Sequence, residues 1–235
     1  MNKTRISRIA GLIYLIVVVT GIFSLAYVPK VLIHDDNLEL TFKNIMQNEQ
    51  LFRLGIASSV ICYTAFLLLP VALYKLLKQV NEFYAKLMVL LAVTSVPISF
   101  YNLYNKFSIL SLISISKQGN AQATSEIPDQ VMSYLRQYDN GIFILTVFWG
   151  LWLLPFGYLV LKSGFLPKVL GILLMLGCFG YLVNFFGNTL SANYTSIGIA
   201  KTIRLLPSIA ELSVCAWLLI IGAKEKIKPS LNFTI

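Results

Sequence analysis

Six long apolar stretches, separated by shorter polar segments, dominate the pattern of hydrophobic and polar positions along the chain. They span residues 9–28, 54–73, 87–103, 141–161, 169–190 and 205–222. At about 1.5 Å per residue, a helix of this length crosses a hydrocarbon core of roughly 30 Å. Barrel strands are short and alternate between apolar and polar positions, whereas these runs are continuously apolar. The pattern predicts an all-α, polytopic transmembrane bundle of six spans, with one membrane-embedded domain over residues 1–235.

The composition supports a membrane protein. Hydrophobic residues make up 57% of the chain and charged residues 12%, and the mean hydropathy is +0.75. Soluble domains carry roughly 25% charged residues, so this chain has too few to cover a water-facing surface. The first stretch also resembles a signal peptide, because Lys3, Arg5 and Arg8 precede it and residues 24–26 read SLA. Its length, in a chain whose later stretches also span, favours a retained helix.

The basic residues gather on one side of the predicted bundle. If the N-terminus is cytoplasmic, the segments on its side hold eleven basic and two acidic residues, and the other side holds eight of each. The whole net charge of +9 then falls on the cytoplasmic face, so the positive-inside rule predicts that both termini are cytoplasmic. Anionic lipid headgroups suit such a face. We expect membrane lipids as partners and no nucleic acid.

Cysteine and histidine exclude several kinds of site. Cys62, Cys178 and Cys215 each fall in a predicted span without a CxxC pair, and we interpret them as small buried side chains. The single histidine, His34, cannot build a His-rich metal site, and a Ser–His–Asp triad would have to recruit it from the first outer loop. The chain contains no GxSxG, HExxH, Walker A or GxGxxG motif. The sequence therefore predicts no metal and no cofactor.

Two connections carry their own local signals. Within residues 35–50 of the first outer loop, apolar residues recur at helical spacing, and Asp36 is placed to cap the first turn. We expect a short amphipathic helix at the outer interface, either as a plain connector or as a lid over the bundle. In the cytoplasmic turn between the fourth and fifth stretches, Gly164 is predicted to end one helix and Pro167 to begin the next.

Polar residues inside the spans form stripes, because their steps of three and four keep them on one face of a helix. The stripes consist of Ser95, Ser99, Asn102 and Lys106 on the third stretch, Arg204, Ser208, Glu211 and Cys215 on the sixth, and Asn184 and Asn188 on the fifth. The fifth stretch also contains Gly177 and Gly180, whose small size lets a neighbouring helix approach closely.

Depth brings three of these residues to one level. Asn102 and Asn184 lie roughly 22 Å from the inner starts of their spans, and Glu211 lies roughly 9 Å below the outer start of its span. In a core of roughly 30 Å, all three fall in the outer half. The remaining candidates lie at the outer rim: Arg53, Lys106, Asp139, Asn140, Asn188 and Arg204. Together they predict a polar recess that opens outward above apolar packing.

The recess has two interpretations. Its polar groups either form a buried network that fixes helix packing or bind a ligand. Inserting an acidic residue at the middle of a membrane span costs roughly 2.5–3.5 kcal/mol, so such residues are functional candidates. We favour the ligand pocket because so many polar groups meet at one level. Trp149, Trp152 and Trp217 also lie well inside the spans, either in the core or lining an apolar cavity below the rim.

Three functional classes follow. The first is binding, and with it transport, of a small amphiphile or lipid-like ligand in the recess. The second is an intramembrane enzyme that uses Glu211 or Asp139 as a general acid or base. The third is an accessory or structural membrane subunit. Binding ranks first because the chain offers a recess but no convincing pair of catalytic groups. Transport has less support, because neither an inverted repeat nor a polar route through the inner half is evident.

Four segments together resemble one protein family. They read RIAGLIYLIVVVTGIFSLAYVP (8–29), NEQLFRLGI (48–56), FLLLPVALYKLLKQVN (66–81) and GLWLLPFGYLVLKSGFLPKVLGILL (150–174). They are similar to the bacterial membrane proteins called domain of unknown function 4386, and the last segment is the most specific. The similarity runs across nearly the whole chain. It implies a small integral protein of the bacterial cytoplasmic membrane, and it carries over no activity.

Overall fold

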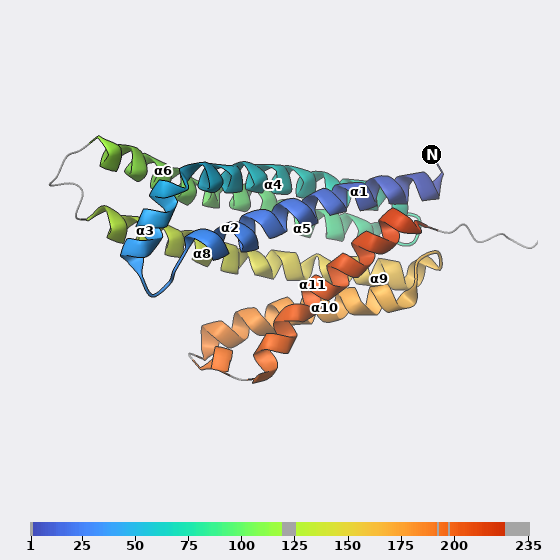
Figure 1. Ribbon diagram of the computed structural model, residues 1–235. Coiled ribbons are helices and arrows are strands. Elements are labelled where there is room, and N and C mark those ends of the chain that lie inside the picture. The colour runs from blue at the N-terminus through green and yellow to red at the C-terminus, as the bar shows by residue number, and fades with distance from the viewer. Residues whose placement is uncertain (1, 119–125, 192, 197, 224–235) are drawn as a thin grey trace, which may run out of the picture.

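The protein is a bundle of long helices (Figure 1). The computed structural model describes residues 2–118, 126–191, 193–196 and 198–223, and every regular element in these ranges is helical. The elements are α1 (Lys3–Ile22), η1 (Phe23–Tyr27), α2 (Val28–Leu32), α3 (Leu38–Gln47), α4 (Glu49–Leu77), α5 (Glu82–Asn102), α6 (Tyr104–Lys117), α8 (Ile127–Leu151), α9 (Leu153–Ser163), α10 (Lys168–Leu190), η2 (Tyr194–Ser196) and α11 (Gly198–Ile220). The prediction of an all-α bundle is confirmed.

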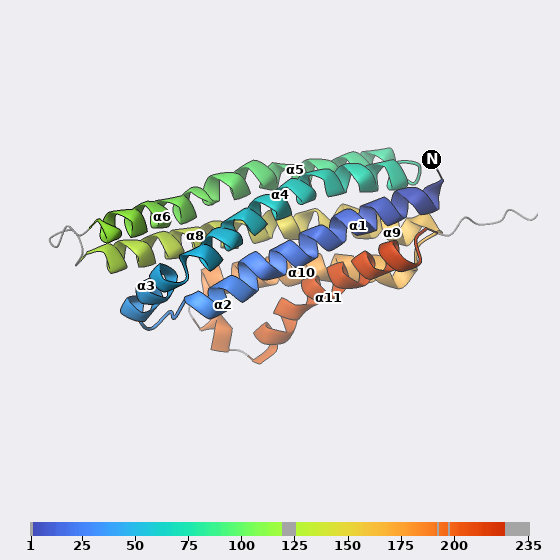
Figure 2. The same cartoon turned by 45° about the horizontal axis from the view of Figure 1, so that its top comes forward.

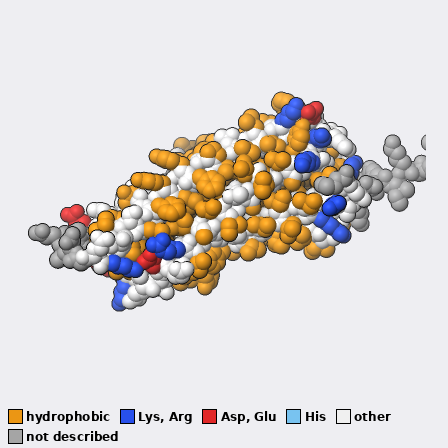
Figure 3. All heavy atoms as spheres, turned by 90° about the horizontal axis from the view of Figure 1, so that it is seen from above, with side chains coloured by type: hydrophobic (Ala, Val, Ile, Leu, Met, Phe, Trp, Pro, Cys, Tyr) orange, Lys and Arg blue, Asp and Glu red, His pale blue; other side chains and the backbone are white. Residues whose placement is uncertain are grey.

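Most of the bundle can cross a membrane. In the described ranges, five helical stretches are long and apolar enough: Lys3–Leu32, Glu49–Leu77, Glu82–Lys117, Ile127–Ser163 and Lys168–Leu190. The sixth predicted span falls in α11, whose apolar part, Leu205–Ile220, is shorter than the other five stretches. Exposed hydrophobic side chains cover the middle of the molecule, and charged side chains gather at its two ends (Figure 3). The chain is therefore a multi-pass membrane protein.

The first and last described segments meet at one end of the bundle, here called the terminal end (Figures 1 and 2). The hydroxyl of Thr4 donates to the carbonyl of Ala223 at 3.1 Å, and the amide of Ala223 donates to Ser7 Oγ at 2.9 Å. The turn between α9 and α10 lies at the same end. There Gly164 adopts a φ of 70°, which favours glycine, and Pro167 precedes the first residue of α10. The predicted ends of these two helices are confirmed.

The opposite end of the bundle, here called the cap, is built by α2, α3, α6 and the first half of α8. Of these, α3, α6 and the start of α8 extend beyond η2 (Figure 1). They enclose a hydrophobic cluster of their own with α4, made of Val28, Leu32, Phe42, Ile45, Phe52, Ile56, Ile109, Leu110, Ile113, Ile127, Val131, Met132 and Leu135. The cap therefore folds around a second apolar core rather than hanging from the bundle as loops.

Helix α3 is the short amphipathic helix expected in the first outer loop. Phe42 and Ile45 on its apolar side are buried in the cap. The cap residue is Asn37, whose side-chain oxygen accepts a hydrogen bond from the amide of Leu40 at 2.9 Å. The prediction that Asp36 caps this helix was wrong, because the helix begins at Leu38 and the capping side chain belongs to the residue just before it.

Trp152 lies at the centre of the main core and is fully buried. Its ring stacks on Phe156 with centroids 5.3 Å apart. The ring of Phe66 meets it edge to face at 5.4 Å, and the tilted ring of Tyr14 lies 6.4 Å away. Such rings bury large apolar areas and fix the spacing of the helices that carry them. This aromatic cluster joins α1, α4, α8 and α9 around one point next to the candidate site.

Candidate functional site

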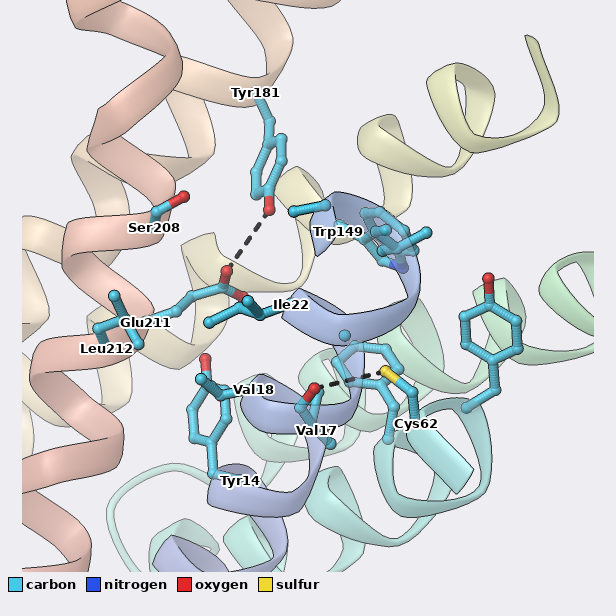
Figure 4. A pocket seen from close by; sticks show the side chains of 15 residues that line it. Tyr14, Val17, Val18, Ile22, Cys62, Trp149, Tyr181, Ser208, Glu211 and Leu212 are labelled. Atoms are coloured by element: carbon cyan, nitrogen blue, oxygen red, sulfur yellow. Dashed lines mark hydrogen bonds between the residues drawn. The ribbon is translucent and has the colours of Figure 1, made fainter. Parts of the chain in front are cut away.

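A cavity of about 300 Å³ lies in the side of the bundle (Figure 4). Its walls come from α1, η1, α4, α8, α10 and α11. The lining residues are Tyr14, Val17, Val18, Gly21, Ile22, Leu25, Ala26, Cys62, Tyr63, Phe66, Trp149, Tyr181, Ser208, Glu211 and Leu212. Its volume lies at the lower end of the range typical of small-molecule sites, roughly 300–1,000 Å³.

The cavity exists because α11 packs on α1 near the terminal end and then leaves it. Near the terminal end, the backbones touch so closely that a Cβ added at Gly11 would lie 2.6 Å from the amide nitrogen of Leu219. Toward the cap, α11 packs on α10 instead, with Pro207 against Gly177 and Gly180. The predicted close approach at these two glycines is confirmed. The two helices therefore diverge, as Figures 1 and 2 show. Residues of both helices line the cavity, so it lies where they separate.

A widened helical turn shapes the wall on the α1 side. Pro29 has no amide hydrogen, so it cannot bond to the carbonyl of Leu25 in the ordinary helical way. The chain forms a π-helical segment just before it, in which the amide of Val28 donates to the carbonyl of Phe23, five residues back. Such segments are frequent at functional sites. This one supplies Leu25 and Ala26 to the cavity wall.

Glu211 is the acidic residue of the cavity and is half-buried there. The hydroxyl of Tyr181 on α10 donates a hydrogen bond to its Oε2 at 3.4 Å. Gly150 of α8 leaves room for Tyr181, because a Cβ at that position would lie 2.8 Å from the tyrosine Cβ. A helix contact made through glycine thus places the residue that contacts the carboxylate.

Tyr14 approaches Glu211 from α1. Its side chain is 2% exposed and its hydroxyl points into the cavity toward the carboxylate (Figure 4). Within the described part of the chain, this hydroxyl has no hydrogen-bond partner. A buried, unpaired hydroxyl costs roughly 1–3 kcal/mol, so a ligand group that bonds to it would recover stability. The cavity therefore offers an unused polar contact beside its carboxylate.

The cavity wall has little charge. Of its fifteen lining residues, all of them described, none is lysine, arginine or histidine. Eight have non-ionisable aliphatic or aromatic side chains, and the other seven are three tyrosines, one cysteine, one glycine, Ser208 and Glu211. Among the described side chains, the ion pairs of the protein do not involve Glu211. An ionised carboxylate in such surroundings is costly unless a donor or a cation joins it.

The mouth of the cavity lies on the side of the bundle. Ile22 on α1 is 55% exposed and Leu212 on α11 is 46% exposed, and Ala26 and Ser208 between them are also exposed. The mouth residues belong to the apolar stretches of both helices. The cavity therefore opens within the apolar belt, between α1 and α11, whereas the sequence suggested a recess that opens toward the outer end.

Two of the sequence candidates form a separate cluster beside the cap. Asn102 donates from its amide to the carbonyl of Tyr138 at 2.8 Å, and the buried ammonium of Lys106 lies 4.1 Å from the centre of the Tyr138 ring. The hydroxyl of Tyr138 lies 3.2 Å from that of Tyr63. Because Tyr63 also lines the cavity, this cluster supports the cavity wall without placing Asn102 or Lys106 in the cavity.

The remaining candidates lie elsewhere. The side-chain amide of Asn188 donates to both oxygens of Asn184 one turn earlier on α10, at 2.7 and 3.2 Å. Arg53 pairs with Glu49 at 2.6 Å on the outside of α4. Asp139 and Asn140 are exposed on α8, and the side chain of Arg204 lies outside the described ones. Of the nine candidates, Glu211 therefore lines the cavity.

Sequence reasoning missed two residues that matter at the cavity. Tyr181 precedes Asn184 by three residues, so it continues the polar stripe of α10 by one more step. Tyr14 is a lone hydroxyl in an aliphatic run. Both could have been found by including tyrosine among the polar residues. Of the tryptophans, Trp149 lines the cavity, whereas Trp152 is fully buried in the core and Trp217 packs against it.

The cavity has no metal-binding arrangement. In the described residues, no three histidine, cysteine, aspartate or glutamate side chains gather where they could hold a metal ion. Cys62, Cys178 and Cys215 are buried free thiols, and the sulfur of Cys62 contacts the carbonyl of Val17 at 3.5 Å. The polar groups of the site can therefore bind or orient a ligand by hydrogen bonding and charge.

Comparison with known proteins identifies the family. The family model described as Domain of unknown function (DUF4386) matches residues 9–222, which is most of the chain. A search of the curated proteins and a search of the solved structures find no match. The resemblance seen in the sequence segments is thereby confirmed.

Proposed function

We propose that this protein, which belongs to the Domain of unknown function (DUF4386) family, binds a small amphiphile that enters its cavity from the bilayer. The observation that carries the proposal is a side-opening cavity whose mouth is apolar and whose wall holds Glu211 and the unpaired hydroxyl of Tyr14. An amphiphile fits both features, because its chain can stay in lipid while its polar end reaches the carboxylate.

Two observations favour binding over the other classes. An enzyme would need two catalytic groups within reach of one substrate, but Asp139 is exposed on α8 while Glu211 lines the cavity. A purely structural network would be closed and fully paired, whereas this site contains open space and an unpaired hydroxyl. The side-opening cavity supports binding from the bilayer, and we propose binding without transport.

We also propose that the terminal end faces the cytoplasm of a bacterial cell. Lys3, Lys78, Lys162 and Lys168 belong to the segments at that end, together with most of the net positive charge of the chain. The positive-inside rule supports this orientation. A fluorescent protein fused to the N-terminus should fold and fluoresce in the cytoplasm, and a periplasmic reporter at the same place should stay inactive. The reverse result would contradict the orientation.

Native mass spectrometry of the gently purified protein tests the binding function. Ser208→Phe should fill the mouth, because the Ser208 hydroxyl points into the cavity (Figure 4). Ile209→Phe is the matched control, since its side chain is 50% exposed and does not line the cavity. We expect wild type and Ile209→Phe to retain the same co-purified amphiphile and Ser208→Phe to lose it. Equal retention by all three would contradict the proposal.

A further inference from the structure

The cavity presents a carboxylate to an apolar space with little to balance it. The described hydrogen bond to Glu211 comes from the hydroxyl of Tyr181, at the long distance of 3.4 Å. One such bond does not replace the hydration that an ionised carboxylate loses in apolar surroundings. A ligand that carries a positive charge would supply what the cavity wall lacks.

Three oxygen groups converge on the same space. Glu211 and Ser208 reach it from α11, and Tyr14 reaches it from α1, with its hydroxyl unpaired (Figure 4). A primary ammonium has three hydrogens to donate and no acceptor. The carboxylate and the two hydroxyl oxygens can each accept one of them. A ligand hydroxyl, by comparison, can donate its single hydrogen to the carboxylate and accept from the two hydroxyls, but it brings no positive charge to balance the carboxylate.

Aromatic rings form a large part of the cavity wall. Five of the lining residues are aromatic: Tyr14, Tyr63, Phe66, Trp149 and Tyr181. Ring faces attract cations that lie within roughly 6 Å of their centres, and the attraction is stronger in apolar surroundings. Trp149 and Tyr181 lie on one side of the cavity and Tyr14 on another, so a cation next to Glu211 would have rings on more than one side (Figure 4).

The same wall disfavours anionic head groups. A phosphate or a fatty-acid carboxylate at this place would lie beside Glu211 and would be repelled by it. Among the described lining residues there is no lysine or arginine to offset that repulsion. The chemistry of the cavity therefore separates amphiphiles by the sign of their charge.

We propose that the ligand is a long-chain alkylammonium, whose head binds Glu211, Tyr14 and Ser208 while its chain passes between α1 and α11 into the bilayer. This inference rests on the binding function proposed above and names the ligand class. The ammonium group can belong to a free single-chain amine or to the head group of an aminophospholipid. The chemistry recognised at Glu211 is the same in both.

Equilibrium binding of two radiolabelled probes tests the inference. The full chain is placed in phosphatidylcholine nanodiscs, and binding of dodecylamine is compared with binding of dodecanol after subtraction of empty discs. We expect wild type to prefer dodecylamine about tenfold, which is the effect of one charge-assisted hydrogen bond. Dodecyl sulfate should bind no better than dodecanol. Phosphatidylethanolamine added to the discs identifies the source: competition with dodecylamine assigns the site to a lipid head group, and lack of competition assigns it to a free amine.

Two matched variants complete the test. Glu211→Gln should abolish the preference for dodecylamine, whereas Glu39→Gln, which neutralises an exposed carboxylate on α3, should retain it. Equal binding of both probes by wild type, with both lost in Ser208→Phe, would overturn the ammonium inference and leave the binding function standing. If no probe shows binding that Ser208→Phe reduces, both proposals are overturned. The comparison of probes on wild type stays decisive even if a variant fails to fold.

Discussion

The boundary between α1 and α11 has two regions that differ in how closely the helices pack. At the seam, defined as Gly11 against Leu218 and Leu219, their backbones are in direct contact. Farther toward the cap the same two helices border the cavity, and among the described atoms a Cβ added at Gly21 would meet the sulfur of Cys62 at an ordinary contact distance of 3.5 Å. The difference lies in where the small residues are. At the seam the glycine is on α1, whereas farther along the glycines are on α10 and draw α11 away.

The two regions also differ in polarity. Around the seam the packing is apolar, and the thiol of Cys215 contacts the carbonyl of Gly11 at 3.8 Å. In the cavity, two turns or so farther along α11 toward the cap, Glu211 and Ser208 face open space. Close packing stabilises the first region, and the second gives up packing to keep polar groups accessible.

The largest expected effect is at the seam. Gly11→Ala places a Cβ within 2.6 Å of the α11 backbone and should lower the free energy of unfolding by roughly 1–3 kcal/mol. Gly21→Ala meets ordinary contact and should be neutral or slightly stabilising, because alanine favours helix. Equilibrium unfolding in mixed micelles measures both. Equal destabilisation would contradict the distinction between seam and cavity.

The next effect concerns the placement of Tyr181. Gly150→Ala would place a Cβ 2.8 Å from the Cβ of Tyr181. This clash would displace the Tyr181 side chain and move its hydroxyl away from Glu211. We expect a loss of about 1–2 kcal/mol in stability from overpacking and a severalfold weaker binding of amphiphile. Tyr181→Phe should reproduce the loss of binding with less loss of stability. If Gly150→Ala bound amphiphile as wild type does, Tyr181 would have no part in the site.

Tyr14 should show opposite effects on stability and on binding. Tyr14→Phe removes a buried hydroxyl that has no partner in the described structure, so the empty protein should become about 1 kcal/mol more stable. Binding of dodecylamine should weaken, because one acceptor is lost. Equilibrium unfolding and nanodisc binding, measured on the same preparation, give the free energy of unfolding and the affinity for dodecylamine. A loss of stability would show that the hydroxyl is already paired in the empty protein.

The smallest effect is expected outside the cavity, at Lys106. Lys106→Met removes the contact with the Tyr138 ring but also removes a buried charge, and these two terms oppose each other. Stability should change by less than about 1 kcal/mol, and amphiphile binding should not change. A marked loss of binding would mean that the cluster around Tyr138 takes part in ligand recognition.

Much of the fold could be predicted from the pattern of the sequence. Apolar length identified the helices, and Gly164 and Pro167 marked the turn at the terminal end, because these signals are local. Asp36 illustrates the limit of such signals, since it lies one residue before Asn37 and both are good capping residues. The cap could not be foreseen, because its core joins helices that lie far apart in the sequence.

The site was harder to predict than the fold. Depth alone grouped Asn102, Asn184 and Glu211, but depth does not say which side of a helix faces which neighbour. In the structure Asn102 contacts α8 at Tyr138, and Glu211 meets Tyr181 of α10. The acid was found because a carboxylate in an apolar span stands out. Its tyrosine neighbours were missed because tyrosine is common in apolar packing.

Photo-crosslinking can show directly whether an amphiphile occupies the space between α1 and α11 within the bilayer. A dodecylamine analogue with a diazirine on its chain is irradiated with the protein in nanodiscs, and the labelled peptides are sequenced. We expect the labels to be concentrated in residues 17–26 and 208–212 and to disappear when unlabelled dodecylamine is added in excess. Labels spread evenly over exposed apolar positions such as Leu90 and Tyr101 of α5, without competition, would contradict that occupancy.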